Sequence, residues 1–256
     1  LEEVTNLVER STALLGEFES EYLALPQDVL ITVMKKHQRY FPVVQAESGK
    51  LMPYFIAVRN GDELHLDVVR EGNEDVIRAR FADAKFFYHN DLRQHLGCYL
   101  PRLGTLTFQD KLGSVLDKVK RLERLAPRLG EMLELSPAEL MTVQRAANLC
   151  KADLATSMVI EMTSLQGTMG RYYALASGEP EGVAIAIEEH YWPRFAGDHL
   201  PVSRLGQIVS MADRLDSLVG IFAAGLRPTG NKDPFALRRA ALGLLRILVE
   251  KQIPLT

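Results

Sequence analysis

The chain has 256 residues and a formal net charge of −3, so it lacks the overall positive charge typical of nucleic-acid-binding proteins, and any such surface must be local. Hydrophobic residues make up 47% and charged residues 25%, a balance that supports a buried core. Its 2 cysteines are too few for a disulfide framework or a zinc cluster. No apolar run approaches the roughly 20 residues that span a bilayer, and no signal-peptide pattern opens the sequence. We therefore expect a cytoplasmic protein.

The N-terminal part of the chain is predicted to mix helices and strands. Over residues 2–21, the spacing of the apolar residues fits one face of a helix and the glutamates fit the other, which predicts an amphipathic helix with an acidic face. The short, β-branched run at residues 29–34 predicts a strand. Two further strands are expected at residues 40–44 and 51–58, joined by a hairpin turn at residues 47–50.

Helical spacing dominates from Glu74 onwards. An apolar stripe at steps of three and four residues from Ile77 to Leu92 predicts a long helix. The chain again reads as helical from Gln109 almost to its end, and residues 136–139 (Ser-Pro-Ala-Glu) form a strong helix start with a capping box.

A break at Pro101 and Gly104 separates these two parts of the chain. We expect an α+β module at residues 1–104 and a mainly α-helical domain at residues 105–256. The chain begins at Leu1 without an initiator methionine and ends without a natural tail, which indicates a fragment of a longer polypeptide.

Two aspartates of the second part lie in contexts that resemble HD-domain phosphohydrolases. In that family, a His-Asp pair and a distant Asp hold divalent metals, which activate water for attack on a phosphate ester. Asp153 and Asp213 match the two aspartates, but Ala152 takes the place of the paired histidine, and its methyl group cannot bind a metal. We therefore expect an HD-like helical domain with a vestigial metal site. The alternative is a functional site at which Asp153, His190 and Asp213 converge; otherwise His190 is a buried residue that hydrogen-bonds a carboxylate.

A series of motifs runs in order along nearly the whole chain. They lie at residues 37–43, 72–88, 108–118, 164–174, 188–194 and 220–240. This series resembles the beta subunit family of the bacterial tetrameric (α2β2) glycyl-tRNA synthetase. The family resemblance implies a ligase that attaches glycine to tRNA with ATP and Mg²⁺, with its adenylation site on the alpha subunit. It also implies a module similar to the B3/B4 domain of phenylalanyl-tRNA synthetase, followed by the HD-like domain.

The same resemblance sets the expected partners, which are the alpha subunit and tRNA(Gly), in the bacterial cytoplasm and without DNA or a membrane. No catalytic residue, cofactor or metal is expected in this chain, which is predicted to be inactive alone. Two basic groups of the helical domain are predicted to contact tRNA, one in a loop before a helix expected to begin at Asp233, a natural phosphate-binding arrangement. The first group is Arg227, Lys232, Arg238 and Arg239; the second is Lys118, Arg121 and Arg128.

Two other functions stay open at this point. One is a divergent HD-type metal-dependent phosphohydrolase acting on nucleotides, against which the missing histidines argue. The other is a purely structural scaffold within the synthetase, in which Arg238 and Arg239 anchor carboxylates and the remaining cations form a solvated face.

Overall fold

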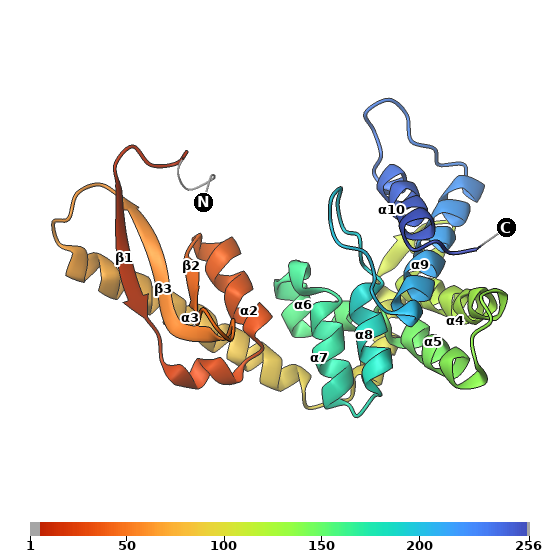
Figure 1. Cartoon of the computed structure of the whole chain (residues 1–256), viewed down its shortest axis with the longest axis horizontal. Helices are drawn as coiled ribbons and strands as arrows, with labels where there is room; N and C mark the ends of the chain where they lie inside the picture. Colours follow the sequence, from red (N-terminus) through yellow and green to blue (C-terminus); the bar gives the residue numbers. More distant parts are fainter. Residues whose placement is uncertain (1–5, 255–256) are drawn as a thin grey trace. The chain divides into compact units, whose positions relative to one another are not determined.

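The computed structural model describes residues 6–254. The chain divides into two compact units, Leu1–Asp91 and Leu92–Thr256, and each is considered by itself (Figure 1). The first unit combines a sheet with helices and the second is mainly helical, which confirms the predicted order of an α+β part and a helical part. The predicted boundary at residue 104 lies further along the chain than this division, and the B3/B4-like and HD-like domain identities remain predictions.

A three-stranded antiparallel sheet forms the first unit, with the strand order β1-β3-β2. Its strands are β1 (Ser11–Glu17), β2 (Phe41–Val44) and β3 (Leu51–Asn60). The predicted hairpin between β2 and β3 is confirmed, because the two strands pair and Gln45 N donates to Lys50 O at 2.8 Å. The long helix α3 (Leu66–Asp91) packs against β1 and begins before the predicted Glu74.

The predicted helix over residues 2–21 is wrong within its described part. Residues 11–17 form β1, and a 3₁₀ turn, η1 (Ser20–Ala24), follows. Burial alternates along β1, because Leu14 and Gly16 are buried and Leu15 is exposed. Pairing of every β1 residue with β3 outweighs the weak helical spacing, since strand stability depends on neighbours that the local sequence does not contain. Residues 2–5 lie outside the described residues.

The predicted strand at residues 29–34 is also wrong. These residues lie in helix α2 (Gln27–Thr32) and the π-helical turn η2 (Val33–His37). Four of the apolar side chains are buried at positions 29, 30, 33 and 34, which is the spacing of one helix face. A short apolar run does not distinguish a strand from a buried helix, and here the helix covers the core.

The second unit is mainly helical (Figure 1). Buried apolar side chains of its helices form its core. Helix α4 packs against α5 and α9, and α9 also packs against α8 and α10. Its elements are η3 (Leu96–Thr105), β4 (Thr107–Gln109), β5 (Gly113–Ser114), α4 (Val115–Met132), α5 (Pro137–Leu149), η4 (Ala152–Ala155), α6 (Ser157–Glu161), η5 (Thr163–Leu165), α7 (Thr168–Ala176), α8 (Glu181–Glu189), α9 (Arg204–Ala223) and α10 (Leu237–Glu250).

Capping residues set the ends of several of these helices. The predicted capping box of Ser136 and Glu139 is confirmed at the start of α5. The prediction of helix from Gln109 is wrong, because β4 and β5 form a small ribbon and α4 begins at Val115. The last helix begins at Leu237 rather than at Asp233, whose carboxylate instead accepts the backbone N–H groups of Leu237 and Arg238, each at 2.9 Å. Within residues 6–254, no helix combines the length and hydropathy that a membrane span requires.

Candidate functional site

Asp213 of α9 lies between two lysines in the interior of the helical unit. Lys118 Nζ is 2.9 Å from Asp213 Oδ1, and Lys151 Nζ is 2.9 Å from Asp213 Oδ2. The two lysine side chains are only 5% and 7% exposed, so both charges are removed from water. Burial alone would raise the pKa of Asp213, but the two ammonium charges outweigh it and hold that pKa well below its usual range. Asp213 is therefore a carboxylate with a cation on each oxygen.

Asp216, on the same face of α9, extends this ion-pair cluster. Its carboxylate is 3.1 Å from Lys118 Nζ and 2.6 Å from Arg121 Nε. Burial acts to lower the pKa of Lys118, but the charges of Asp213 and Asp216 exceed that effect and raise it. Lys118 also donates to Ser217 Oγ at 2.8 Å, so its ammonium is engaged within the protein. These contacts connect α4 to α9.

Asp153 is fully buried in η4 and faces the start of α7. Its Oδ2 accepts the backbone N–H of Gly167 at 2.6 Å and that of Gly170 at 3.1 Å. Burial raises the pKa of Asp153 to about 6, although these two hydrogen bonds act to lower it. Asp153 thus accepts hydrogen bonds from N–H groups at the N-terminus of α7 that have no partner within the helix, and the helix dipole favours a carboxylate there.

His190 is fully buried at the C-terminal end of α8. Its Nδ1 lies 2.5 Å from the carbonyl oxygen of Ile187, which can only accept, so we assign the proton to Nδ1 and a lone pair to Nε2. Burial, followed by the charge of Lys151, holds the pKa of His190 well below its usual value, so the ring is neutral. The predicted partner of a buried His190 was a carboxylate, and a carbonyl group takes that place.

The arrangement does not fit a divalent metal centre. Among residues 6–254, no group of three or more His, Cys, Asp or Glu side chains is placed to hold a metal ion. Both oxygens of Asp213 face lysine ammonium groups, and one oxygen of Asp153 is bound to backbone N–H groups. The positive charge that a metal would supply at Asp213 is already present in the protein, so no metal-dependent step follows from these residues.

A cavity of about 570 Å³ opens beside this cluster in the helical unit. His190 and Asp213 contribute to its wall, together with residues of α9, α10 and the segment that follows α8. The candidate functional site of this unit therefore consists of the ion-pair cluster and the cavity beside it.

Comparisons with known proteins assign the family. The family described as glycyl-tRNA synthetase beta subunit matches residues 1–256. The glycine–tRNA ligase beta subunit of Moorella thermoacetica is 55% identical over 251 residues, covering 98% of this chain and 36% of that protein. Those of Trichodesmium erythraeum and Clostridioides difficile are 52% and 53% identical, covering 100% and 99% of this chain and 36% of each relative.

The chain belongs to the glycyl-tRNA synthetase beta subunit family. It spans 36% of the length of these relatives. The family resemblance carried by its ordered motifs is therefore confirmed.

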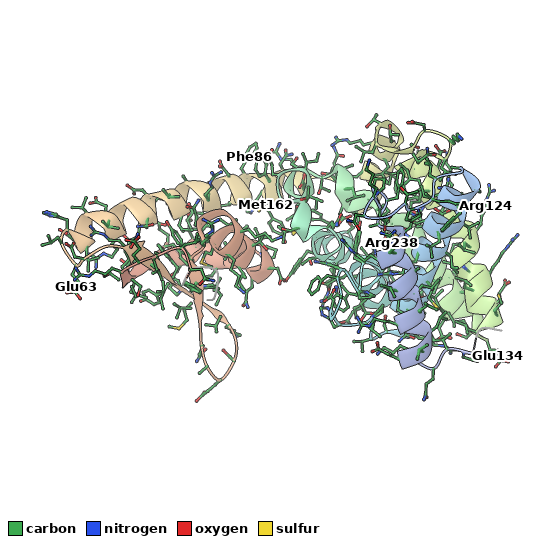
Figure 2. All side chains as sticks on the ribbon, turned by 90° about the horizontal axis from the view of Figure 1, so that it is seen from above. Glu63, Phe86, Arg124, Glu134, Met162 and Arg238 are labelled. Carbon is green, nitrogen blue, oxygen red and sulfur yellow. The ribbon has the colours of Figure 1, made fainter. Side chains whose placement is uncertain are left out.

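The basic residues predicted to contact tRNA in this family member differ in accessibility. Lys118 is buried and ion-paired, so its position contradicts the predicted tRNA contact, and Arg121 is half-buried against Asp216. Arg128 of α4 is exposed. All four residues of the first predicted group are exposed, in the loop from α9 to α10 and the first turn of α10, a segment called the basic loop below; Figure 2 labels Arg238. Its members are Arg227, Lys232, Arg238 and Arg239.

Lys151 is the residue of this site that the sequence interpretation missed. It lies two positions before Asp153, between the buried residues Cys150 and Ala152. A lysine is almost never buried without a partner, so a lysine between apolar neighbours is a usable signal for an internal ion pair. The sequence does not show that the partner is Asp213, because the packing of α9 brings the two residues together.

Proposed function

We infer that this chain is a tRNA-contacting part of a glycine–tRNA ligase beta subunit, and that ATP-dependent activation of glycine takes place on a separate alpha subunit. The family assignment over the whole chain is the observation that carries this proposal. The relatives are named as beta subunits of a glycine–tRNA ligase, which supports an alpha-subunit partner and a tRNA substrate.

The exposed basic loop supports the tRNA contact. Duplex RNA is bound largely through its phosphates and 2′-hydroxyls, so a few exposed cations suffice on a chain whose net charge is −3. Asp233 already accepts the N–H groups of Leu237 and Arg238, so the start of α10 offers little free backbone to a phosphate. The expected contacts therefore come from the side chains of Arg227, Lys232, Arg238 and Arg239.

The phosphohydrolase alternative has no support. Metal-assisted hydrolysis needs a metal that polarises or activates water. At Asp213 the required ligand atoms face Lys118 and Lys151, and Asp153 faces the N-terminus of α7. A scaffold without RNA contact remains the competing proposal, and mutation of the loop distinguishes the two.

Charge reversal in the basic loop of the assembled synthetase tests the tRNA contact. We expect the double variant Arg227→Glu/Arg238→Glu to charge tRNA at least about tenfold more slowly, because each substitution removes a phosphate contact and adds repulsion. Glycine-dependent pyrophosphate exchange should stay within about twofold of the unchanged enzyme, since glycine activation involves no tRNA phosphate.

Arg93→Glu is the matched control, because Arg93 is an exposed arginine of the same unit outside the loop. Charging should persist in that variant. Equal loss of charging and pyrophosphate exchange in the loop variants would assign these residues to subunit assembly or folding. Unchanged charging would establish the scaffold function instead.

A further inference from the structure

Buried polar atoms without a hydrogen-bond partner gather beside the 570 Å³ cavity. In the described part of the chain these atoms are Asp153 Oδ1, His190 Nε2, Tyr191 OH, Arg194 Nε and Asp213 Oδ1. All of these residues except Asp153 line the cavity. Lys118 Nζ lies 2.9 Å from Asp213 Oδ1 and compensates it electrostatically. The cavity wall therefore holds three uncompensated polar atoms within the described residues, which are His190 Nε2, Tyr191 OH and Arg194 Nε. Unsatisfied buried polar groups are rare in native proteins and indicate a missing water or ligand.

These three atoms require a ligand that both donates and accepts hydrogen bonds. His190 Nε2 carries a lone pair, because Nδ1 holds the proton. Burial raises the pKa of Tyr191 well above its usual value, so its phenol keeps its proton and can donate. Arg194 Nε is a donor, while its Nη2 already donates to Gln166 O at 3.2 Å. A bare anion cannot satisfy His190, whereas a hydroxyl group can serve both His190 and Tyr191.

The charge available in the cavity is positive. Asp213 is neutralised by Lys118 and Lys151, and Arg214 donates to backbone carbonyls and to Ser210 Oγ. The remaining charges of the lining are those of Arg194 and Arg239. Arg239 is exposed and forms no ion pair with any residue from 6 to 254. A guanidinium group that is not paired with a carboxylate of the protein favours a phosphate or carboxylate ligand.

Aromatic side chains form part of the cavity wall. Phe108 and Phe235 both line it, and Phe235 is 38% exposed. Aromatic faces stack on nucleic-acid bases of any sequence. The volume of about 570 Å³ lies within the range of about 300–1,000 Å³ of small-molecule sites.

We propose that this cavity binds a single nucleotide, with the phosphate at Arg194 and Arg239, a ribose hydroxyl between His190 and Tyr191, and the base against Phe108 or Phe235. The ligand is either a free mononucleotide or an unpaired nucleotide of an RNA strand, and both offer the same phosphate, ribose and base. Binding involves no metal and no bond cleavage. The proposal goes beyond the tRNA contact of the basic loop, because a free nucleotide can occupy the cavity without tRNA.

Calorimetric titration of the intact chain and of the assembled synthetase tests this proposal. The probes are the four 5′-ribonucleoside monophosphates, adenosine, inorganic phosphate, and the 2′,3′-dideoxy form of the best nucleotide. We expect one site, with the monophosphate bound at least about tenfold more tightly than adenosine or phosphate alone, because only the nucleotide uses both ends of the cavity. Comparing the mononucleotide with a short single-stranded RNA that has a free 3′ hydroxyl separates a free nucleotide from a terminal one. The same strand carrying a 3′-phosphate tests whether the terminal hydroxyl is required.

Two substitutions assign the binding to the cavity. Arg239→Ala should weaken the monophosphate about tenfold, because a charge-assisted hydrogen bond is lost. Tyr191→Phe removes only the hydroxyl and should reduce the discrimination between the ribose and dideoxy forms, while His190 Nε2 still accepts a hydrogen bond from the ribose hydroxyl. Arg124→Ala is the charge-matched control, since Arg124 is exposed on α4 (Figure 2) and does not line the cavity. Thermal unfolding of each variant checks that the fold is retained.

Arg238→Ala separates this proposal from the tRNA contact of the loop. Arg238 neighbours Arg239 but does not line the cavity, so its loss should weaken tRNA binding and leave the mononucleotide affinity unchanged. Equal loss of mononucleotide affinity in the Arg124, Arg238 and Arg239 variants would show diffuse charge attraction and overturn the cavity. Absence of binding at millimolar mononucleotide, or a crystal structure that shows only ordered water beside His190 and Tyr191, would also overturn it.

Discussion

Lys118 and Lys151 carry the charge that compensates Asp213 in the core of the helical unit. Both lysine side chains are almost fully buried, and each lies 2.9 Å from one oxygen of the same carboxylate. Lys151 also lies 4.1 Å from the centre of the Tyr191 ring, a distance that permits a cation–π interaction. The charges of this cluster depend on one another, because removal of one leaves another buried charge without compensation.

Lys151→Met tests the role of this ion pair. The substitution keeps an unbranched side chain but leaves Asp213 Oδ2 without its ammonium partner, so we expect a loss of about 3–5 kcal/mol in the free energy of unfolding. Urea denaturation at neutral pH gives this quantity. The control is Lys120→Met, because Lys120 pairs with Asp117 on the exposed surface and should contribute less than about 1 kcal/mol. Equal effects of the two substitutions would contradict the buried-pair account.

Asp153 predicts a pH dependence of stability. Its pKa is raised from 3.8 to about 6 by burial, so between these values the folded protein binds more protons than the unfolded chain. The free energy of unfolding that Asp153 contributes should therefore fall as the pH rises through this window, at up to about 1.4 kcal/mol per pH unit. The difference in stability between the unchanged protein and Asp153→Asn, measured by urea denaturation from pH 4 to pH 7, should show that slope. The exposed Asp110→Asn is the control. A constant difference would show that the two backbone N–H groups keep Asp153 ionised.

At the scale of elements, β1 shows why local spacing misled the interpretation. The glutamates and apolar residues of positions 2–21 follow helical spacing, yet all seven residues of β1 pair with β3. Gly16 sits directly against the Phe55 ring, where a Cβ atom would overlap the aromatic carbons. Position 16, next to the C-terminal end of β1, thus requires a residue of low strand propensity for a packing reason.

Gly16→Val tests this packing. Valine favours a strand, but its side chain must displace Phe55, which is fully buried, so we expect a loss of about 1–3 kcal/mol in the free energy of unfolding. Ala13→Val on the same strand is the matched control, because Ala13 is exposed and its substitution adds strand propensity without overlap. Chemical denaturation of both variants measures the difference. A stabilised Gly16→Val protein would contradict the close approach of Phe55.

At the scale of the whole molecule, the chain spans 36% of the length of the Moorella thermoacetica relative and divides into two compact units. We expect the purified chain alone to support neither glycine-dependent pyrophosphate exchange nor tRNA charging, since the proposed function places glycine activation on the alpha subunit. Both reactions should return when the complete beta subunit and the alpha subunit are combined. Exchange by the chain alone would contradict this division of labour.

The sequence by itself determined the family, the order of an α+β part before a helical part, the β2–β3 hairpin and the Ser136 capping box. These features rest on motifs or on interactions between residues close in the chain. Only the tertiary structure decided that residues 11–17 form a strand, that residues 29–34 are helical, and that Lys118 is buried. Each of these depends on a distant partner, which is β3, the core of the first unit, or Asp213 and Asp216 of α9. A sequence pattern records the side chains of a segment, whereas burial and charge compensation depend on what packs against it.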